Sequence, residues 1–292
     1  MIRARLPMHH RLVALARGRD KIDIHLMKTP FKNSNLVSAI SLVAVIIGIA
    51  TILFAAEQKQ ARVTEVIHDV RLLTAKTAGH PAAVNDAVHE GTAVRTGTDS
   101  RAELTFTDQT LTRLGANTVF SFGGAARTYD LGSGAILMSA PRESGTVKIT
   151  TAVATCAVSG FTMISEYHGN TWNKVLMLNG DGYVSLRRNP GDKRHMHSSE
   201  ILIFRPDATV LPQPQQFDIC NVISQGYLVA GFAKKLPEWP ALVNLCERQR
   251  SEPVKKKLID PTSQDIIDQS INARPMEPVP RPTVIPTGER FQ

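Results

Sequence analysis

The sequence predicts a mainly β protein: an antiparallel β-sandwich or roll with an N-terminal transmembrane helix and a small C-terminal helical appendage. Short apolar runs, separated by turn residues every eight to twelve or so positions, predict the β core. An uninterrupted apolar run at residues 36–56 predicts the membrane helix. After Phe217 the apolar spacing changes to three or four residues, which predicts helices.

Residues 1–35 are a short basic segment that we expect to lie in the cytoplasm. They hold eight Lys and Arg side chains against Asp20 and Asp23, so they carry +6 of the total net charge of +8. The rest of the chain is nearly neutral and lacks the broad basic face that phosphate binding requires, which excludes nucleic acid as an expected partner. A basic segment beside a membrane helix suits contact with anionic lipid of the inner membrane.

Residues 36–56 are expected to form one transmembrane helix. Twenty-one residues with only Ser38, Ser41 and Thr51 as polar side chains span about 32 Å as a helix, close to the hydrocarbon thickness of a bilayer. Because basic residues precede the helix, the positive-inside rule places the N-terminus in the cytoplasm and the body in the periplasm of a bacterium.

The alternative is a cleaved signal peptide that starts at Met27 and leaves a secreted body. The apolar run is longer than a usual signal core, and cleavage after Ala56 would place Phe54 where a small residue is needed. We therefore favour a retained single-pass anchor, and both alternatives export the body.

Three cysteines follow the apolar run, so complete internal pairing is excluded. Cys156 lies in an apolar, strand-like run and is expected to be a small buried side chain. Cys220 and Cys246 could pair in an oxidising compartment, and three unpaired thiols are the alternative.

The β domain is expected over residues 62–190. Residues 62–75 are predicted to form its first strand, and glycines mark the joints between those that follow. The later strands are predicted at residues 93–95, 102–107, 111–114, 119–122, 135–138, 147–150, 152–158, 161–166, 174–178 and 183–186.

The hairpin around Asp108-Gln109 contains a basic residue, Arg113, between leucines. Leu111 and Leu114 have opposite parity, so a regular strand cannot turn both toward one core. One extra residue in the second strand, a β-bulge, would let both leucines face inward with Arg113 at the rim. We therefore expect a bulge and a structural role for Arg113.

Several motifs in order resemble a FecR domain, the exported domain named after a membrane regulator of iron transport. They are GTAVRTGTDSRAELTFTDQTLTRLGANTVFSF (91–122), YDLGSGAILMSAP (129–141), VKITTAVATCAVSGFTMIS (147–165) and VLMLNGDGYVSL (175–186). The resemblance covers roughly residues 63–187. Its turn and core positions are Gly97, Ala102, Leu104, Phe106, Arg113, Leu114, Gly115, Asn117, Gly160 and Gly180.

Two positions depart from the family pattern. Gln109 stands where an Asp-Gly turn has glycine, so the turn lacks the residue that most easily adopts a positive φ. Ser159 stands where the family often has arginine, which places in doubt any function carried by that arginine.

The resemblance implies a non-catalytic protein that binds an envelope protein or polysaccharide outside the cytoplasm and relays the signal across the inner membrane. Known relays carry a cytoplasmic helical domain that contacts a sigma factor, whereas only 35 residues precede the apolar run here. A cytoplasmic regulator is therefore one expected partner, and an envelope scaffold or binding module with no transcriptional role is the alternative.

Residues 191–250 are expected to form a strand followed by two helices, divided by Pro237 and Pro240. Residues 251–292 contain seven prolines and equal numbers of acidic and basic side chains, which predicts a disordered tail.

No pattern in the sequence predicts catalysis, a cofactor or a metal. There is no P-loop, no dinucleotide motif and no nucleophile elbow. His195 and His197 share one face of an expected strand and could begin a metal site, but the sequence suggests no third ligand nearby. We therefore interpret them as solvated histidines and expect no enzyme.

Overall fold

The computed structural model describes residues 60–74, 77–124, 127–169, 171–252 and 258–261. The predicted segments 1–35 and 36–56, and most of the predicted tail, lie outside these residues. Within the described residues, no helix is long and apolar enough to cross a membrane. They fall within one unit, Gln58–Gln292.

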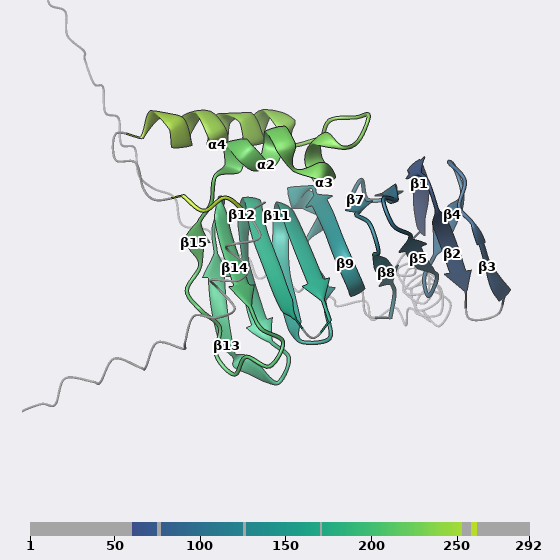
Figure 1. Cartoon of the computed structure of the whole chain (residues 1–292), viewed down its shortest axis with the longest axis horizontal. Helices are drawn as coiled ribbons and strands as arrows, with labels where there is room; N and C mark the ends of the chain where they lie inside the picture. The colour runs from purple at the N-terminus through teal and green to yellow at the C-terminus, as the bar shows by residue number, and fades with distance from the viewer. Residues whose placement is uncertain (1–59, 75–76, 125–126, 170, 253–257, 262–292) are drawn as a thin grey trace, which may run out of the picture. The chain divides into compact units, whose positions relative to one another are not determined.

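The described strands join into one sheet of fifteen strands (Figure 1). They are β1 (Gln60–Ile67), β2 (Val70–Thr74), β3 (Thr77–Pro81), β4 (Ala87–His89), β5 (Ala93–Thr96), β6 (Arg101–Phe106), β7 (Leu111–Leu114), β8 (Val119–Phe122), β9 (Thr128–Ala140), β10 (Val147–Thr150), β11 (Ala154–His168), β12 (Trp172–Leu186), β13 (Asn189–Met196), β14 (Glu200–Phe204) and β15 (Gln215–Gln216).

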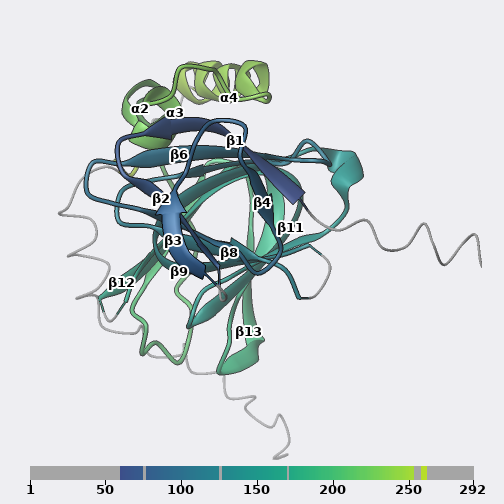
Figure 2. The same ribbon diagram turned by 90° about the vertical axis from the view of Figure 1, so that its right-hand side faces the viewer.

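The main path of the sheet runs β15-β14-β12-β11-β10-β9-β7-β6-β1-β4, and β2, β3, β5, β8 and β13 branch from it. Among the described strand pairs, β9 and β10 are parallel and the others are antiparallel. Figure 2 shows the strands curving around a common interior. The predicted mainly β fold with a small C-terminal helical part is confirmed.

Two apolar cores lie on opposite faces of the strands. The inner core contains a cluster of aromatic rings in which Phe106 packs edge-on against Phe122 and Tyr129, with ring centroids 4.8 and 5.2 Å away. The outer core lies between the sheet and the C-terminal helices, and includes Leu111 from β7 and Phe217. Central strands are therefore buried on both faces.

Three helices cover the outer face: α2 (Ile219–Gln225), α3 (Tyr227–Ala230) and α4 (Trp239–Ser251). Figures 1 and 2 both show them together along one side of the strands. The side chain of Asp218 accepts a hydrogen bond from the Asn221 amide and so caps the start of α2. The sequence predicted two helices divided by Pro237 and Pro240. Pro237 does lie between α3 and α4, but Pro240 lies in the first turn of α4, where it removes no helical hydrogen bond.

The three cysteines form one disulfide and one free thiol, which is one of the two alternatives that the sequence left open. A disulfide joins Cys220 of α2 to Cys246 of α4, and Cys156 is free and buried. Burial raises the pKa of the Cys156 thiol to about 12, so it remains protonated and unreactive at neutral pH.

The predicted strand at 62–75 was wrong in one respect, because it is divided into β1 and β2 at His68 and Asp69. His68 has a positive φ of 60°, which ends the extended run. Conversely, the predicted strands at 152–158 and 161–166 form the single strand β11. At Gly160 the register shifts and the ribbon bends without ending.

The predicted bulge in the second hairpin strand was also wrong. The register is regular, with Ala102 opposite Leu114 and Thr105 opposite Leu111. Leu114 faces the inner core and Leu111 faces the outer core, so both leucines are buried without a bulge.

Candidate functional site: a buried arginine between the sheet and the C-terminal helices

Arg113 is completely buried and does not lie at the rim of the sheet, as the sequence had suggested. It shares the parity of Leu111 on β7, so it points to the outer face that the helices cover. An arginine in this position needs partners for all of its donors, because an unpaired buried charge is strongly destabilising.

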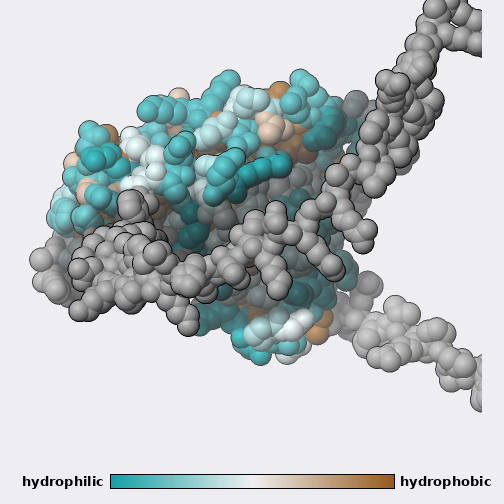
Figure 3. Space-filling view, turned by 180° about the vertical axis from the view of Figure 1, so that it is seen from behind, coloured by the Kyte–Doolittle hydropathy of each residue, from teal (hydrophilic) through white to brown (hydrophobic). Residues whose placement is uncertain are grey.

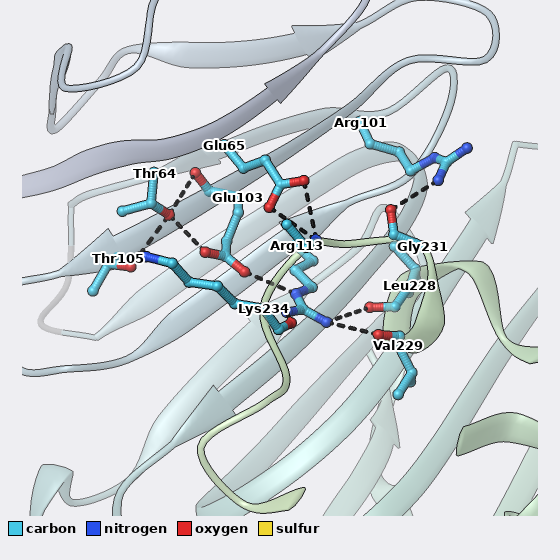
Figure 4. Close-up of polar contacts among 11 residues, drawn as sticks. Thr64, Glu65, Arg101, Glu103, Thr105, Arg113, Leu228, Val229, Gly231 and Lys234 are labelled. Carbon is cyan, nitrogen blue, oxygen red and sulfur yellow. Dashed lines mark hydrogen bonds and ion pairs between the residues drawn. The ribbon is translucent and has the colours of Figure 1, made fainter. Parts of the chain in front are cut away.

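The guanidinium group of Arg113 bridges the sheet and the helical segment (Figure 4). Its Nε donates to Glu103 Oε2 at 2.9 Å, on the neighbouring strand β6. Its Nη1 donates to the carbonyl oxygens of Leu228 at 3.2 Å and Val229 at 3.0 Å, and its Nη2 donates to the carbonyl oxygen of Lys234. One side chain of the sheet thus fixes three backbone positions in and after α3.

Two further contacts complete the surroundings of this ion pair. The Arg113 guanidinium lies over the Phe232 ring, 4.4 Å from its centroid, a cation–π arrangement that suits a desolvated arginine. The other carboxylate oxygen of Glu103 accepts a hydrogen bond of 2.8 Å from Thr64 on β1. Both charges are therefore hydrogen-bonded, which is the condition under which a buried pair is tolerated.

Side chains from neighbouring strands hold the same helical segment. The Glu65 carboxylate on β1 accepts from the Ala233 amide at 3.3 and 3.4 Å, and Arg101 on β6 donates to the Gly231 carbonyl at 3.0 Å. Figure 4 shows these groups converging on residues 228–234. We call this set of contacts the Arg113 junction.

Gly115 contributes to the junction by leaving room for α3. A Cβ atom at this position would lie 2.8 Å from Cε2 of Tyr227. A second predicted turn residue, Asn117, has a positive φ of 53°, and its amide donates to the carbonyl of Gly97 at 3.0 Å. Residues 113–117 (RLGAN) therefore combine a turn with the docking surface for a helix.

The remaining predicted positions lie away from the junction. Ala102, Leu104, Phe106 and Leu114 are buried in the inner core. Gly160 and Gly180 lie beside each other where β11 and β12 bend; both have a positive φ, and a Cβ on Gly180 would lie 2.8 Å from the Gly160 carbonyl oxygen.

The departures from the family pattern have local structural consequences. Gln109 adopts a positive φ of 64°, so a residue with a side chain occupies a conformation that favours glycine. An arginine from another part of the chain, Arg142, lies beside Gly160, and its Cγ would lie 2.4 Å from a Cβ on that glycine.

A second charged group fixes the end of the described chain. Lys174 on β12 pairs with Glu166 on β11 at 2.9 Å and donates to the carbonyl of Pro261 at 3.2 Å. Burial by itself would raise the pKa of Glu166, but the Lys174 charge and hydrogen bonds from His168 and Lys174 outweigh it and lower that pKa.

His195 and His197 lie together with a carboxylate that the sequence did not suggest. Their side chains and that of Asp181 are exposed, and one ligand atom from each lies within 4.8 Å of the others. The acid was missed because its proximity depends on the register between β12 and β13, which sequence spacing does not give.

By its fold, the described part of the chain is a mainly β domain whose sheet is covered by helices on one face. Within this domain, residues 92–181 match the family model described as FecR protein, so this part of the chain is a FecR domain. The match lies inside the range 63–187 that the motifs indicated, and the resemblance is confirmed. It includes Glu103 and Arg113 but ends before the helices to which Arg113 binds.

Two crystal structures of "a putative anti-sigma factor from Parabacteroides distasonis", at 2.50 and 1.65 Å resolution, are similar to the chain. Each has 16% sequence identity and a TM-score of 0.41. The alignment to the first covers 47% of this chain and 64% of that one, and the alignment to the second covers 60% and 87%. No curated protein sequence matches the chain.

Proposed function

We propose that the chain is a non-catalytic, membrane-anchored regulatory protein of the FecR type. Its FecR domain binds an envelope protein or polysaccharide in the periplasm, and the 36–56 segment carries the signal across the inner membrane to a cytoplasmic regulator. The family match at residues 92–181 is the observation that supports this proposal most strongly.

The Arg113 junction connects the two parts of the described chain to which a partner could bind. A helical cover outside the family match is held to the FecR domain by side chains of β1, β6 and β7. These contacts join the two parts, which allows a partner bound to one part to influence the other. The described surface visible in Figure 3 is largely hydrophilic, with hydrophobic residues in small separate spots, which suits a reversible partner.

The second candidate is an anchored envelope scaffold with no transcriptional role. The family match at residues 92–181 lies entirely after the apolar run, so it is equally consistent with this candidate.

Affinity capture from solubilised membranes of the native host separates the two candidates. The full chain is compared with a variant that lacks residues 1–32 and retains the apolar run. Under the relay, a sigma factor or another cytoplasmic regulator is recovered with the full chain and lost with the truncated one. Recovery of the same envelope components with both chains, and of no cytoplasmic regulator, would overturn the relay in favour of the scaffold.

A further inference from the structure

We propose that Asp181, His195 and His197 form a binding site for a divalent transition-metal ion such as Zn²⁺. The site lies on the β12–β13 ribbon, away from the Arg113 junction, and does not depend on the proposed function. Two imidazoles and one carboxylate are a ligand set that Zn²⁺ takes in proteins, with the remaining positions open to water or to a group from another molecule.

The register between the two strands brings the three side chains to one face. Tyr183 lies opposite His195, and Gly182 lies opposite Met196. Because side chains alternate along a strand, residues of the other parity point inward, and Met196 is completely buried. The outer face therefore presents Asp181 and Tyr183 beside both histidines.

The distances between the ligand atoms suit one shared ion. Nδ1 of His197 lies 2.7 Å from Oδ1 of Asp181, and the ring centroids of His195 and His197 lie 4.2 Å apart. Zn–N and Zn–O bonds of about 2.0–2.1 Å place the ligand atoms of a tetrahedral ion about 3.3 Å from one another. The 2.7 Å contact between His197 and Asp181 must lengthen, and the wider separations, which are at most 4.8 Å, must shorten. Small rotations of these exposed side chains achieve both.

Neighbouring groups limit the freedom of the ligands. The Tyr183 ring stacks on His195 with centroids 4.6 Å apart, and Glu200 accepts a hydrogen bond of 2.8 Å from the backbone amide of His197. A positive charge lies on the same face, because the Lys193 ammonium lies 5.3 Å from the Tyr183 centroid. The Asp181 carboxylate offsets this charge when a divalent ion binds.

The test is a titration of the purified full chain in detergent with Zn²⁺, followed by calorimetry, and with Co²⁺, followed by its visible absorption. The test variant is His195→Gln/His197→Gln. The matched control is His80→Gln/His89→Gln, which removes two other exposed histidines. Circular dichroism and melting temperature check that both variants fold as the parent does, which is expected because all four side chains are exposed.

We expect the parent and the control to bind one more equivalent of Zn²⁺ than the test variant. The absorption of tetrahedral Co²⁺ should disappear only in the test variant. Asp181→Asn removes a direct ligand and should weaken binding by at least the ~10-fold that loss of an outer-shell partner causes. The parent and the test variant share every histidine except His195 and His197, so a difference between these two proteins is due to the ribbon. Equal stoichiometry and affinity in the parent and the test variant would overturn the proposal and leave a solvated His–Asp pair.

Discussion

Replacing Arg113 with methionine should destabilise the fold and release the helical segment. Methionine fills part of the volume but leaves Glu103 buried without its 2.9 Å partner, and three backbone carbonyls lose their donor. Breaking a buried ion pair on one side costs about 3–5 kcal/mol, so we expect the free energy of unfolding to fall by that amount.

A double-mutant cycle with Glu103→Gln measures the interaction itself. The double variant removes both charges, so its loss of unfolding free energy should be smaller than the sum of the two single losses by about 2 kcal/mol. Urea unfolding of the full chain in detergent, followed by circular dichroism, gives these values. Hydrogen exchange of the amides in residues 228–234 should accelerate most in Arg113→Met, because this side chain binds the segment directly.

The matched control is Arg71→Met, which removes an arginine paired with Asp69 at 3.3 Å near the surface. Its side chain is 48% exposed, whereas that of Arg113 is 0% exposed, so the loss should stay below about 1 kcal/mol. If Arg113→Met costs no more than Arg71→Met, or if the two junction variants are additive, the junction does not hold the helices.

Three other predictions concern single contacts. Replacing Cys220 and Cys246 with alanine removes a cross-link between residues 26 positions apart. The chain-entropy relation predicts that the free energy of unfolding falls by about 3.5 kcal/mol, which is measurable as a lower melting temperature. An unchanged melting temperature would contradict the cross-link. Gln109→Gly should raise the free energy of unfolding by about 0.5 to 1 kcal/mol, because relief of the positive φ, worth about 1–2 kcal/mol, outweighs the cost of about 0.5–1 kcal/mol from the greater freedom of the unfolded chain; a destabilised variant would refute that reasoning. The lowered pKa of Glu166 stabilises the fold above the carboxyl's unfolded pKa of about 4.3, and this stabilisation is lost as the pH falls through the lowered folded value. Glu166→Gln should therefore show a smaller loss of stability between pH 6 and pH 2 or so than the parent in acid titrations of unfolding, and an equal loss would exclude the Lys174 pair as the cause.

The strands could be predicted because alternation and turn residues are local signals. Ala102, Leu104 and Phe106 share one parity and are buried together, as their spacing requires. The β-bulge predicted in the next hairpin was wrong because we assumed that only one face of the sheet is buried. Leu111 and Leu114 are both buried on opposite faces, and nothing local states that helices more than 100 residues later cover the second face.

The candidate sites could be predicted only in part for the same reason. Arg113 stood out because a charge between leucines is unusual, but its partners come from β6 and from residues 228–234. His195 and His197 stood out as a pair, and Asp181 joins them only through strand register. Contacts between distant segments follow from topology, which residue spacing does not contain.

The redox state of Cys220 and Cys246 in living cells tests most directly whether the FecR domain works outside the cytoplasm. Cells of the native host are quenched in acid, the full chain is denatured, and free thiols are counted by alkylation with and without prior reduction. Because disulfides persist in oxidising compartments, we predict one alkylated thiol per chain, Cys156, before reduction and three after it. Three alkylated thiols before reduction would place the domain in a reducing compartment and contradict both the relay and the scaffold.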